Sequence, residues 1–146
     1  ITISINPPLY PEWLNFALPD LLRNDGFDVP IYPAGMDFSW KDYDLALYLL
    51  GDEDLLTRSH IFIDWSKIMG GIGRAFERPW NYIPSVMISF GHPYYLYDAP
   101  RIPAYINAYS TTVSMQKAVV ECLLGRQDFT GVSPVDAYCG LEDAYY

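Results

Sequence analysis

The sequence has few cysteines, few basic residues and no long apolar run. Cys122 and Cys139 are its only cysteines, and they form no C-x-x-C motif. We therefore expect two reduced thiols rather than a disulfide scaffold or a zinc cluster. No uninterrupted apolar segment approaches the ~20 residues that a membrane-spanning helix needs. What remains is a soluble globular chain of 146 residues, long enough for one domain with a buried core.

Lysine and arginine are too sparse to suggest a polyanionic partner. Nine Lys and Arg oppose 18 Asp and Glu, which gives a net charge of −9. No cluster of basic residues is available to neutralise phosphates. Nucleic acids and membrane surfaces are therefore not expected as partners.

The chain begins directly in the strand-like segment ITISI, without methionine and without a signal sequence. We expect this start to be a cut within a longer polypeptide. Any targeting signal would then lie upstream. The sequence leaves the compartment unknown, with a cytoplasmic location favoured over secretion.

Strand-like apolar runs alternate with helical patterns along the chain. Leu45–Leu50 and Ser85–Phe90 are nearly continuous apolar runs, each followed by glycine, which is typical of strands covered on both faces. They are predicted to be adjacent or near-adjacent central parallel strands. Further strands are expected at residues 2–5, 29–32 and 104–109, and helices at 19–25, 66–78 and 112–124. The fold class is therefore α/β, a mostly parallel sheet flanked by helices on both faces in a flavodoxin-like or Rossmann-like sandwich.

The predicted helix at 66–78 contains the run GGIGRAF. Its apolar residues keep helical spacing, so Ile68, Met69, Ile72 and Phe76 are expected to face the core. A nucleotide-binding loop is rejected, because Phe76 stands where the third glycine of that fingerprint belongs and no strand precedes the run directly.

Residues 1–128 are expected to form a single α/β domain. From Phe129 to Tyr146 the sequence carries Gly131, Pro134 and Gly140 and has no clear periodicity. We expect this tail to be an extended strap packed on the domain.

Ligands of α/β proteins gather beyond the carboxyl ends of the strands. The residues that follow the predicted strands there, and that are candidates to contact a substrate or a neighbouring domain, are Asp52, Glu53, Arg58, Trp65, His92 and Tyr94. Each has a structural alternative: Asp52 and Glu53 suit a solvated turn or helix cap, and His92 suits a locally bonded turn. No metal-ligating set, cofactor motif or serine nucleophile elbow is present, so neither a metal nor a cofactor is expected.

Aromatic residues make up 16% of the chain and gather in SFGHPYYLYDAPRIPAYINAYS, residues 89–110. Tyrosines such as Tyr94 and Tyr105 have an apolar ring and a polar tip, which suits sugar stacking and a domain interface equally well. The residues alone thus indicate an α/β domain without a complete active site.

Three segments carry a resemblance to a known family: PSVMISFGHPYYLYDAP, PAYINAYSTTVSMQKAVVECLLGR and DFTGVSPV. Together they resemble the carboxyl-terminal α/β domain of glycoside hydrolase family 3, closest to the two-domain β-N-acetylhexosaminidase branch. The resemblance covers residues 84–135 and, more loosely, YDLALYLLGDE. Ser133 departs from it, because the family usually has leucine there.

The resemblance implies a partner domain. In that family a preceding barrel supplies the aspartate nucleophile and, in the hexosaminidase branch, a histidine acid/base; neither motif occurs in this chain. The chain is then the auxiliary half of a β-N-acetylhexosaminidase-type or β-glucosidase-type enzyme, inactive alone, with the amino-terminal barrel of the same polypeptide as its partner and carbohydrate as an indirect one. In other branches the acid/base glutamate comes from the loop after the strand that LALYLL resembles, which would place it near Glu53 in this chain. A free-standing flavodoxin-like module for a small ligand is the alternative.

Overall fold

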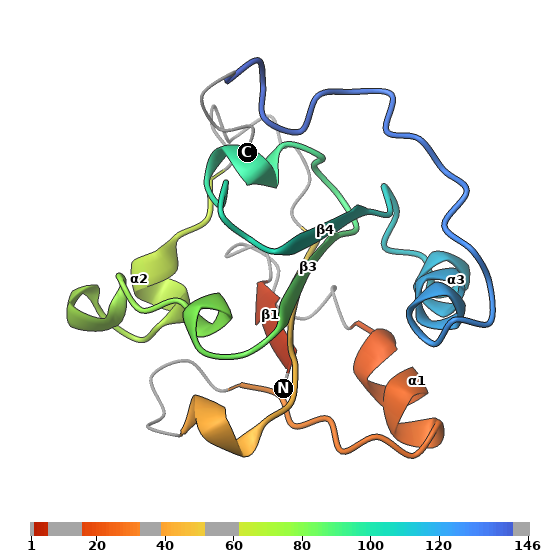
Figure 1. The fold of residues 1–146 in the computed structure, drawn as a ribbon, viewed down its shortest axis with the longest axis horizontal. Helices are drawn as coiled ribbons and strands as arrows, with labels where there is room; N and C mark the ends of the chain where they lie inside the picture. The colour runs from red at the N-terminus through yellow and green to blue at the C-terminus, as the bar shows by residue number, and fades with distance from the viewer. Residues whose placement is uncertain (1, 6–15, 33–38, 52–61, 142–146) are drawn as a thin grey trace.

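The computed structural model describes residues 2–5, 16–32, 39–51 and 62–141 and shows a parallel sheet between two layers of helices (Figure 1). The predicted α/β class is confirmed. Four strands pair in parallel in the order β1-β2-β3-β4, namely β1 (Thr2–Ile5), β2 (Ala46–Leu50), β3 (Ser85–Ser89) and β4 (Ala104–Asn107).

The two continuous apolar runs are neighbouring strands in the middle of the sheet, as predicted. Leu47 of β2 pairs with Val86 of β3, and Leu50 pairs with Ser89. All five residues of β2 are buried. Leu45, which was predicted to begin the strand, lies just outside it and is 37% exposed.

Alternate side chains of the sheet pack into two separate hydrophobic cores, one on each face. Tyr48 and Leu50 of β2 pack on the side of α2 (Trp65–Ile68). Leu47 and Leu49 pack on the opposite side, against α1 (Leu18–Asn24) and α3 (Val113–Leu123). Figure 1 shows α2 on one side of the sheet and the other two helices on the other. This arrangement follows from the two-residue period of a strand, which sends successive side chains to opposite faces.

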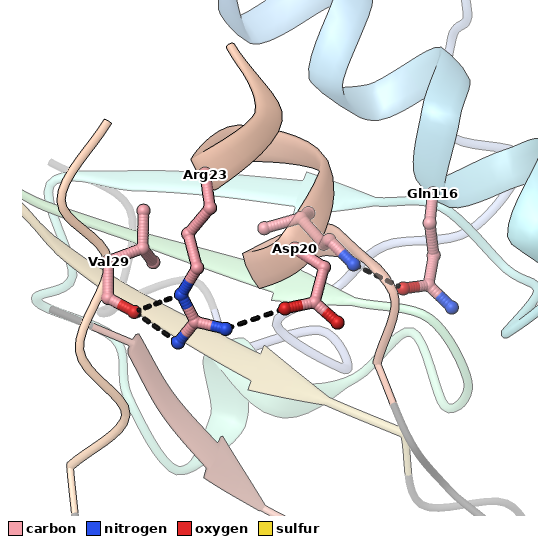
Figure 2. A network of polar contacts seen from close by, with 5 residues as sticks. Asp20, Arg23, Val29 and Gln116 are labelled. Atoms are coloured by element: carbon pink, nitrogen blue, oxygen red, sulfur yellow. Dashed lines mark hydrogen bonds and ion pairs between the residues drawn. The ribbon is translucent and has the colours of Figure 1, made fainter. Parts of the chain in front are cut away.

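Helix α1 is shifted by one residue from the predicted range 19–25, and both of its predicted end signals are present. Pro19 occupies its first turn, where no amide donor is needed, and Gly26 follows its end with φ +94°. Two side chains then fix the helix in place (Figure 2). Gln116 of α3 accepts a hydrogen bond from the Leu18 amide at 3.0 Å, and the Arg23 guanidinium donates to the Val29 carbonyl and to Asp20.

The predicted helix at 66–78 is wrong beyond Ile68. Gly70 and Gly71 have φ values of +78° and +149°, which an α-helix does not contain, and the chain turns out into solvent. As a result Ile72 and Phe76 are 81% and 85% exposed instead of facing the core. A single-turn 3-10 helix, η2 (Ile72–Arg74), replaces part of the expected helix. Other single-turn 3-10 helices of the described chain are η1 (Trp40–Asp42), η3 (Pro79–Asn81) and η4 (Tyr95–Tyr97).

Other predicted bounds also change. Residues 29–32 form an isolated bridge at Ile31 instead of a strand, with Val29 packed in the α1 core and Tyr32 in the α2 core. Strand β4 ends at Asn107 instead of residue 109, because Tyr109 takes a left-handed conformation with φ +60°. Helix α3 is close to its prediction and is followed by Gly125 with φ +68°.

After α3 the chain runs without regular structure along the outside of the domain. The predicted strap comprises residues 129–146, and we use the name strap for the described residues 127–138. Phe129 and Val132 are 57% and 91% exposed, and Ser133 is joined to Tyr109 by a hydrogen bond of 2.8 Å between their hydroxyls. Tyr138 packs against the α2-side core. The two cysteines are free thiols, and within the described ranges no helix is long and apolar enough to cross a membrane.

Candidate functional site

All four strands present their carboxyl ends at one edge of the parallel sheet. The next described helix after β1 is α1, on one face of the sheet, and the next after β2 is α2, on the other face. In α/β proteins ligands bind where consecutive connections leave toward opposite faces, because the two loops splay apart there. This edge is therefore the candidate site.

Three of the candidate residues, Asp52, Glu53 and Arg58, lie outside the described residues. The structure describes the positions on either side of them. Gly51 is buried directly after β2, and the Ile63 amide donates a hydrogen bond of 2.9 Å to Oδ2 of Asp98. Asp98 follows η4, so the chain that leads into α2 is joined to the turn after β3.

The turn after β3 is held by the last residues of two strands. The Ser89 hydroxyl donates to the His92 carbonyl at 2.5 Å. The Pro93 carbonyl accepts from the Tyr105 hydroxyl at 3.0 Å and from Nδ2 of Asn107 at 3.3 Å. These bonds satisfy the backbone of a proline-containing turn that has no sheet partner of its own. They also fix the turn as a platform at the carboxyl edge.

His92 and Tyr94 lie side by side on this platform. The Tyr94 amide donates to Nδ1 of His92 at 3.3 Å, so a neutral imidazole carries its proton on Nε2. The His92 ring packs edge-on against Tyr94, with centroids 4.9 Å apart, and against buried Tyr95, at 5.6 Å. The described residues contain no group of three or more His, Cys, Asp or Glu side chains that would hold a metal ion.

Trp65 belongs to a different environment. Its ring packs against Tyr48 and Trp80, with centroids 6.2 and 5.4 Å away, and the Arg78 guanidinium lies 4.0 Å above it. Burial lowers the pKa of Arg78, while the aromatic faces stabilise its charge. The structure thus places Trp65 in the α2-side core and does not bring it to His92.

Ser89 and Asn107 of this edge escaped the sequence analysis, and Tyr105 was considered there only for sugar stacking or a domain interface. Burial raises the pKa of Tyr105, so its hydroxyl remains a neutral donor to the turn. Ser89 and Asn107 are partners in the register of β3 and β4. Their signal was present in the sequence, since each is a polar residue at the end of an apolar run, but the pairing of the two runs was needed to interpret it.

The comparisons with known proteins now decide the family. No protein-family model matches the chain. A β-N-acetylglucosaminidase/β-glucosidase of Cellulomonas fimi is 37% identical over 106 residues, which is 70% of this chain and 18% of that protein. The solved structure of the β-glucoside phosphorylase BglX bound to 2FGlc superposes with a TM-score of 0.76 and 29% identity over 96% of this chain, and a second BglX structure with 0.74 and 28% over 98%; each match covers 26% of the BglX chain.

The chain belongs to the carboxyl-terminal α/β domains of glycoside hydrolase family 3. The resemblance carried by residues 84–135 is confirmed. This family 3 domain spans 18% and 26% of the relatives it matches, so it corresponds to a small part of each of them.

The described edge of the family 3 domain offers one engaged carboxylate, a hydrogen-bond donor and an aromatic face. Retaining glycosidases use two carboxyl groups about 5 Å apart. The carboxylate that the turn contributes, Asp98, is engaged by the Ile63 amide. His92 and Tyr94 offer a donor and a ring face, which are the groups that orient a hydroxylated ring.

Proposed function

We propose that this chain is the auxiliary carboxyl-terminal domain of a family 3 enzyme that cleaves β-glycosides of glucose or N-acetylglucosamine. It scaffolds an amino-terminal barrel and forms part of the rim of that barrel's sugar site. The observation that carries the proposal is the match of 96% of this chain to 26% of a longer enzyme. The same proportion argues against the alternative of a free-standing flavodoxin-like module.

The two kinds of relative differ in the group that accepts the sugar. By name, one is a glucosaminidase/glucosidase and the other a phosphorylase, and these transfer the sugar to water and to phosphate respectively. Both reactions begin with cleavage of a β-glycoside. The substrate class of our proposal is therefore a β-glucoside or β-N-acetylglucosaminide, and the acceptor is an outcome of the test below.

The first experiment compares the isolated chain with the full-length polypeptide on aryl β-glucosides and aryl β-N-acetylglucosaminides, with and without inorganic phosphate. We expect turnover by the full-length protein alone, because the sequence of this chain shows no nucleophile with a paired acid/base. A rate that rises with phosphate and yields a sugar phosphate identifies a phosphorylase. Turnover by the isolated chain that disappears when one of its own carboxylates is substituted would contradict the auxiliary role.

A finer part of the proposal concerns the loop Asp52–Arg58. We propose that it faces the barrel, with Glu53 as the carboxyl group that approaches the sugar. Two observations support this: Gly51 directly follows the central strand β2 at the candidate edge, and the next described helices after β1 and β2 lie on opposite faces of the sheet. The hexosaminidase branch, in which the barrel supplies the acid/base, is the competing interpretation.

The test of Glu53 uses leaving groups of different quality in the full-length enzyme. If Glu53 is the general acid, Glu53→Gln slows cleavage of substrates with poor leaving groups by about 10²–10⁴-fold and leaves activated aryl glycosides much less affected. Glu77→Gln is the matched control, because Glu77 pairs with Arg74 at 3.6 Å on the exposed turn before η3. Equal rates for Glu53→Gln and wild type on both substrates would remove the acid/base role but leave the auxiliary role intact.

A further inference from the structure

A groove runs between the edge strand β4, helix α3 and the strap. Its volume is about 920 Å³. The floor includes the consecutive residues 105–109 and the α3 residues Met115, Ala118 and Val119, and the strap supplies Phe129 and Val132. Figure 1 shows the strap arching around this side of the domain, outside β4 and α3.

The edge of β4 that lies in this groove has backbone groups without a backbone partner in the described part of the chain. The Ala108 amide donates to the Ser89 carbonyl at 2.7 Å, so even-numbered residues of β4 direct their backbone groups toward β3. Because these directions alternate along a strand, the N–H and C=O groups of Tyr105 and Asn107 point away from the sheet. No backbone hydrogen bond joins them to the strap or to any other described segment.

The Asn107 side chain lies between this edge and the turn after β3, since its Nδ2 donates to the Pro93 carbonyl. Oδ1 of Asn107 is buried and has no hydrogen-bond partner among the described residues. Buried polar atoms in native proteins are nearly always paired. The groove thus combines an apolar wall with an edge strand whose outward backbone groups have no backbone partner among the described segments.

The charge of the groove selects among occupants. Asp128 and Asp136 line it, and none of its lining residues is Lys, Arg or His. The whole chain has a net charge of −9. Pairing with a second copy of β4 would bring like charges together, whereas a segment with basic residues would be attracted.

We propose that this groove binds an extended, basic segment of the longer polypeptide as an additional strand along β4. Strand addition to an open edge uses backbone bonds for affinity and pockets for alternate side chains, and the groove offers both. The relatives are much longer than this chain, which spans only 18% and 26% of them. Their length supports another part of the same polypeptide as the source of the added strand. The proposal does not depend on the identity of the acid/base group.

The first test uses the 146-residue chain and a fluorescein-labelled heptapeptide, Thr-Val-Lys-Val-Lys-Val-Thr. We expect saturable binding that weakens with salt, together with slower hydrogen exchange at the amides of Tyr105 and Asn107. Two versions of the peptide, N-methylated at odd or at even positions, distinguish strand pairing from apolar contact. One version loses about tenfold or more in affinity, because each missing backbone bond costs severalfold, and the other binds normally.

Protein variants provide the matched controls. Ala118→Trp fills the groove from α3 and abolishes peptide binding, whereas Lys117→Trp adds the same ring to the exposed side of the helix and leaves binding unchanged. Asp128→Lys weakens binding and reduces its salt dependence. Should Ala118→Trp fail to fold, the pair of N-methylated peptides still decides the question.

The full-length protein tests the source of the strand. Its own segment occupies the groove, so residues 104–109 exchange more slowly than in the 146-residue chain and the heptapeptide does not bind. Equal peptide affinity for both forms would overturn the internal source in favour of a separate polypeptide. Protection of Tyr105 and Asn107 that increases with concentration without peptide would indicate a second copy instead. Equal affinity for the unmodified peptide and both N-methylated peptides would overturn strand pairing and would indicate a groove that binds apolar ligands.

Discussion

The stability of this domain depends on one buried amide that joins α1 to α3. Gln116 is 1% exposed and Leu18 fully buried. Oε1 of Gln116 accepts from the Leu18 amide at 3.0 Å (Figure 2). Its Nε2 donates to the Thr111 carbonyl at 2.7 Å. Gln116→Leu retains most of the side-chain volume but removes both bonds, so the perturbation is confined to hydrogen bonding.

The expected cost follows from what is left unpaired. A buried amide without an acceptor costs about 1–3 kcal/mol, and a lost hydrogen bond about 0.5–1.5 kcal/mol. Thr111 is half-buried, so water replaces part of its loss. We expect Gln116→Leu to lower the free energy of unfolding by about 2–3 kcal/mol, which for a chain of this size lowers the unfolding midpoint by about 4–12 °C.

Urea and thermal unfolding, followed by circular dichroism, measure this loss. Lys117→Leu, one residue away on the exposed side of α3, is the control and stays within about 0.5 kcal/mol of wild type. An unfolding midpoint for Gln116→Leu equal to that of Lys117→Leu would refute the reasoning, because it would mean that the Leu18 amide does not need this acceptor.

Gln116→Glu adds a pH dependence with a definite sign. The carboxylate retains the acceptor, but burial raises its folded pKa above the unfolded value of about 4.3. The contribution of the introduced carboxyl group to the free energy of unfolding of this variant is therefore fully present below a pH of about 4.3. It is lost as the pH rises through the folded pKa. The deficit relative to wild type grows from pH 4 to pH 7, and a deficit independent of pH would contradict the buried position.

Three further predictions concern other parts of the fold. The Tyr48 hydroxyl is buried and has no hydrogen-bond partner within the described segments, and burial raises the pKa of Tyr48; Tyr48→Phe is therefore neutral or stabilising by up to about 1 kcal/mol in urea unfolding, whereas a clear loss would reveal a bond to that oxygen. The Arg126 guanidinium donates a hydrogen bond to Asp25 at 2.6 Å and lowers the pKa of that carboxyl. Wild type is therefore more stable to unfolding than Asp25→Asn above the ordinary pKa of about 3.9. This difference in the free energy of unfolding disappears as the pH falls through the lowered pKa and becomes smaller in 1 M salt. Phe76→Ser, at an 85% exposed position, leaves the free energy of unfolding within about 0.5 kcal/mol of wild type. Met69→Ala, in the core, lowers it by about 2–5 kcal/mol. A larger loss for Phe76→Ser than for Met69→Ala would instead favour the helix predicted at 66–78.

The candidate site shows how far local sequence reaches. The apolar runs ending at Leu50 and Phe90 were enough to place the following residues at the carboxyl edge, so His92 and Tyr94 were expected where they lie. Their supporting partners were not. Tyr105 and Asn107 hold the turn from 12 and 14 positions further along the chain, and only the register of β3 against β4 brings them to it.

The sequence alone determined the elements whose signals are local. A strand buried on both faces must be apolar at every position, and Pro19 and Gly26 have dihedral angles that open and close a helix, so β2, β3 and α1 were predicted from their own residues. The tertiary structure decided the rest. Ile72 and Phe76 have helical spacing, but the left-handed turn at Gly70 and Gly71 carries them into water. Gln116 lies on the buried side of α3 because a distant helix end requires an acceptor there, which no local pattern encodes.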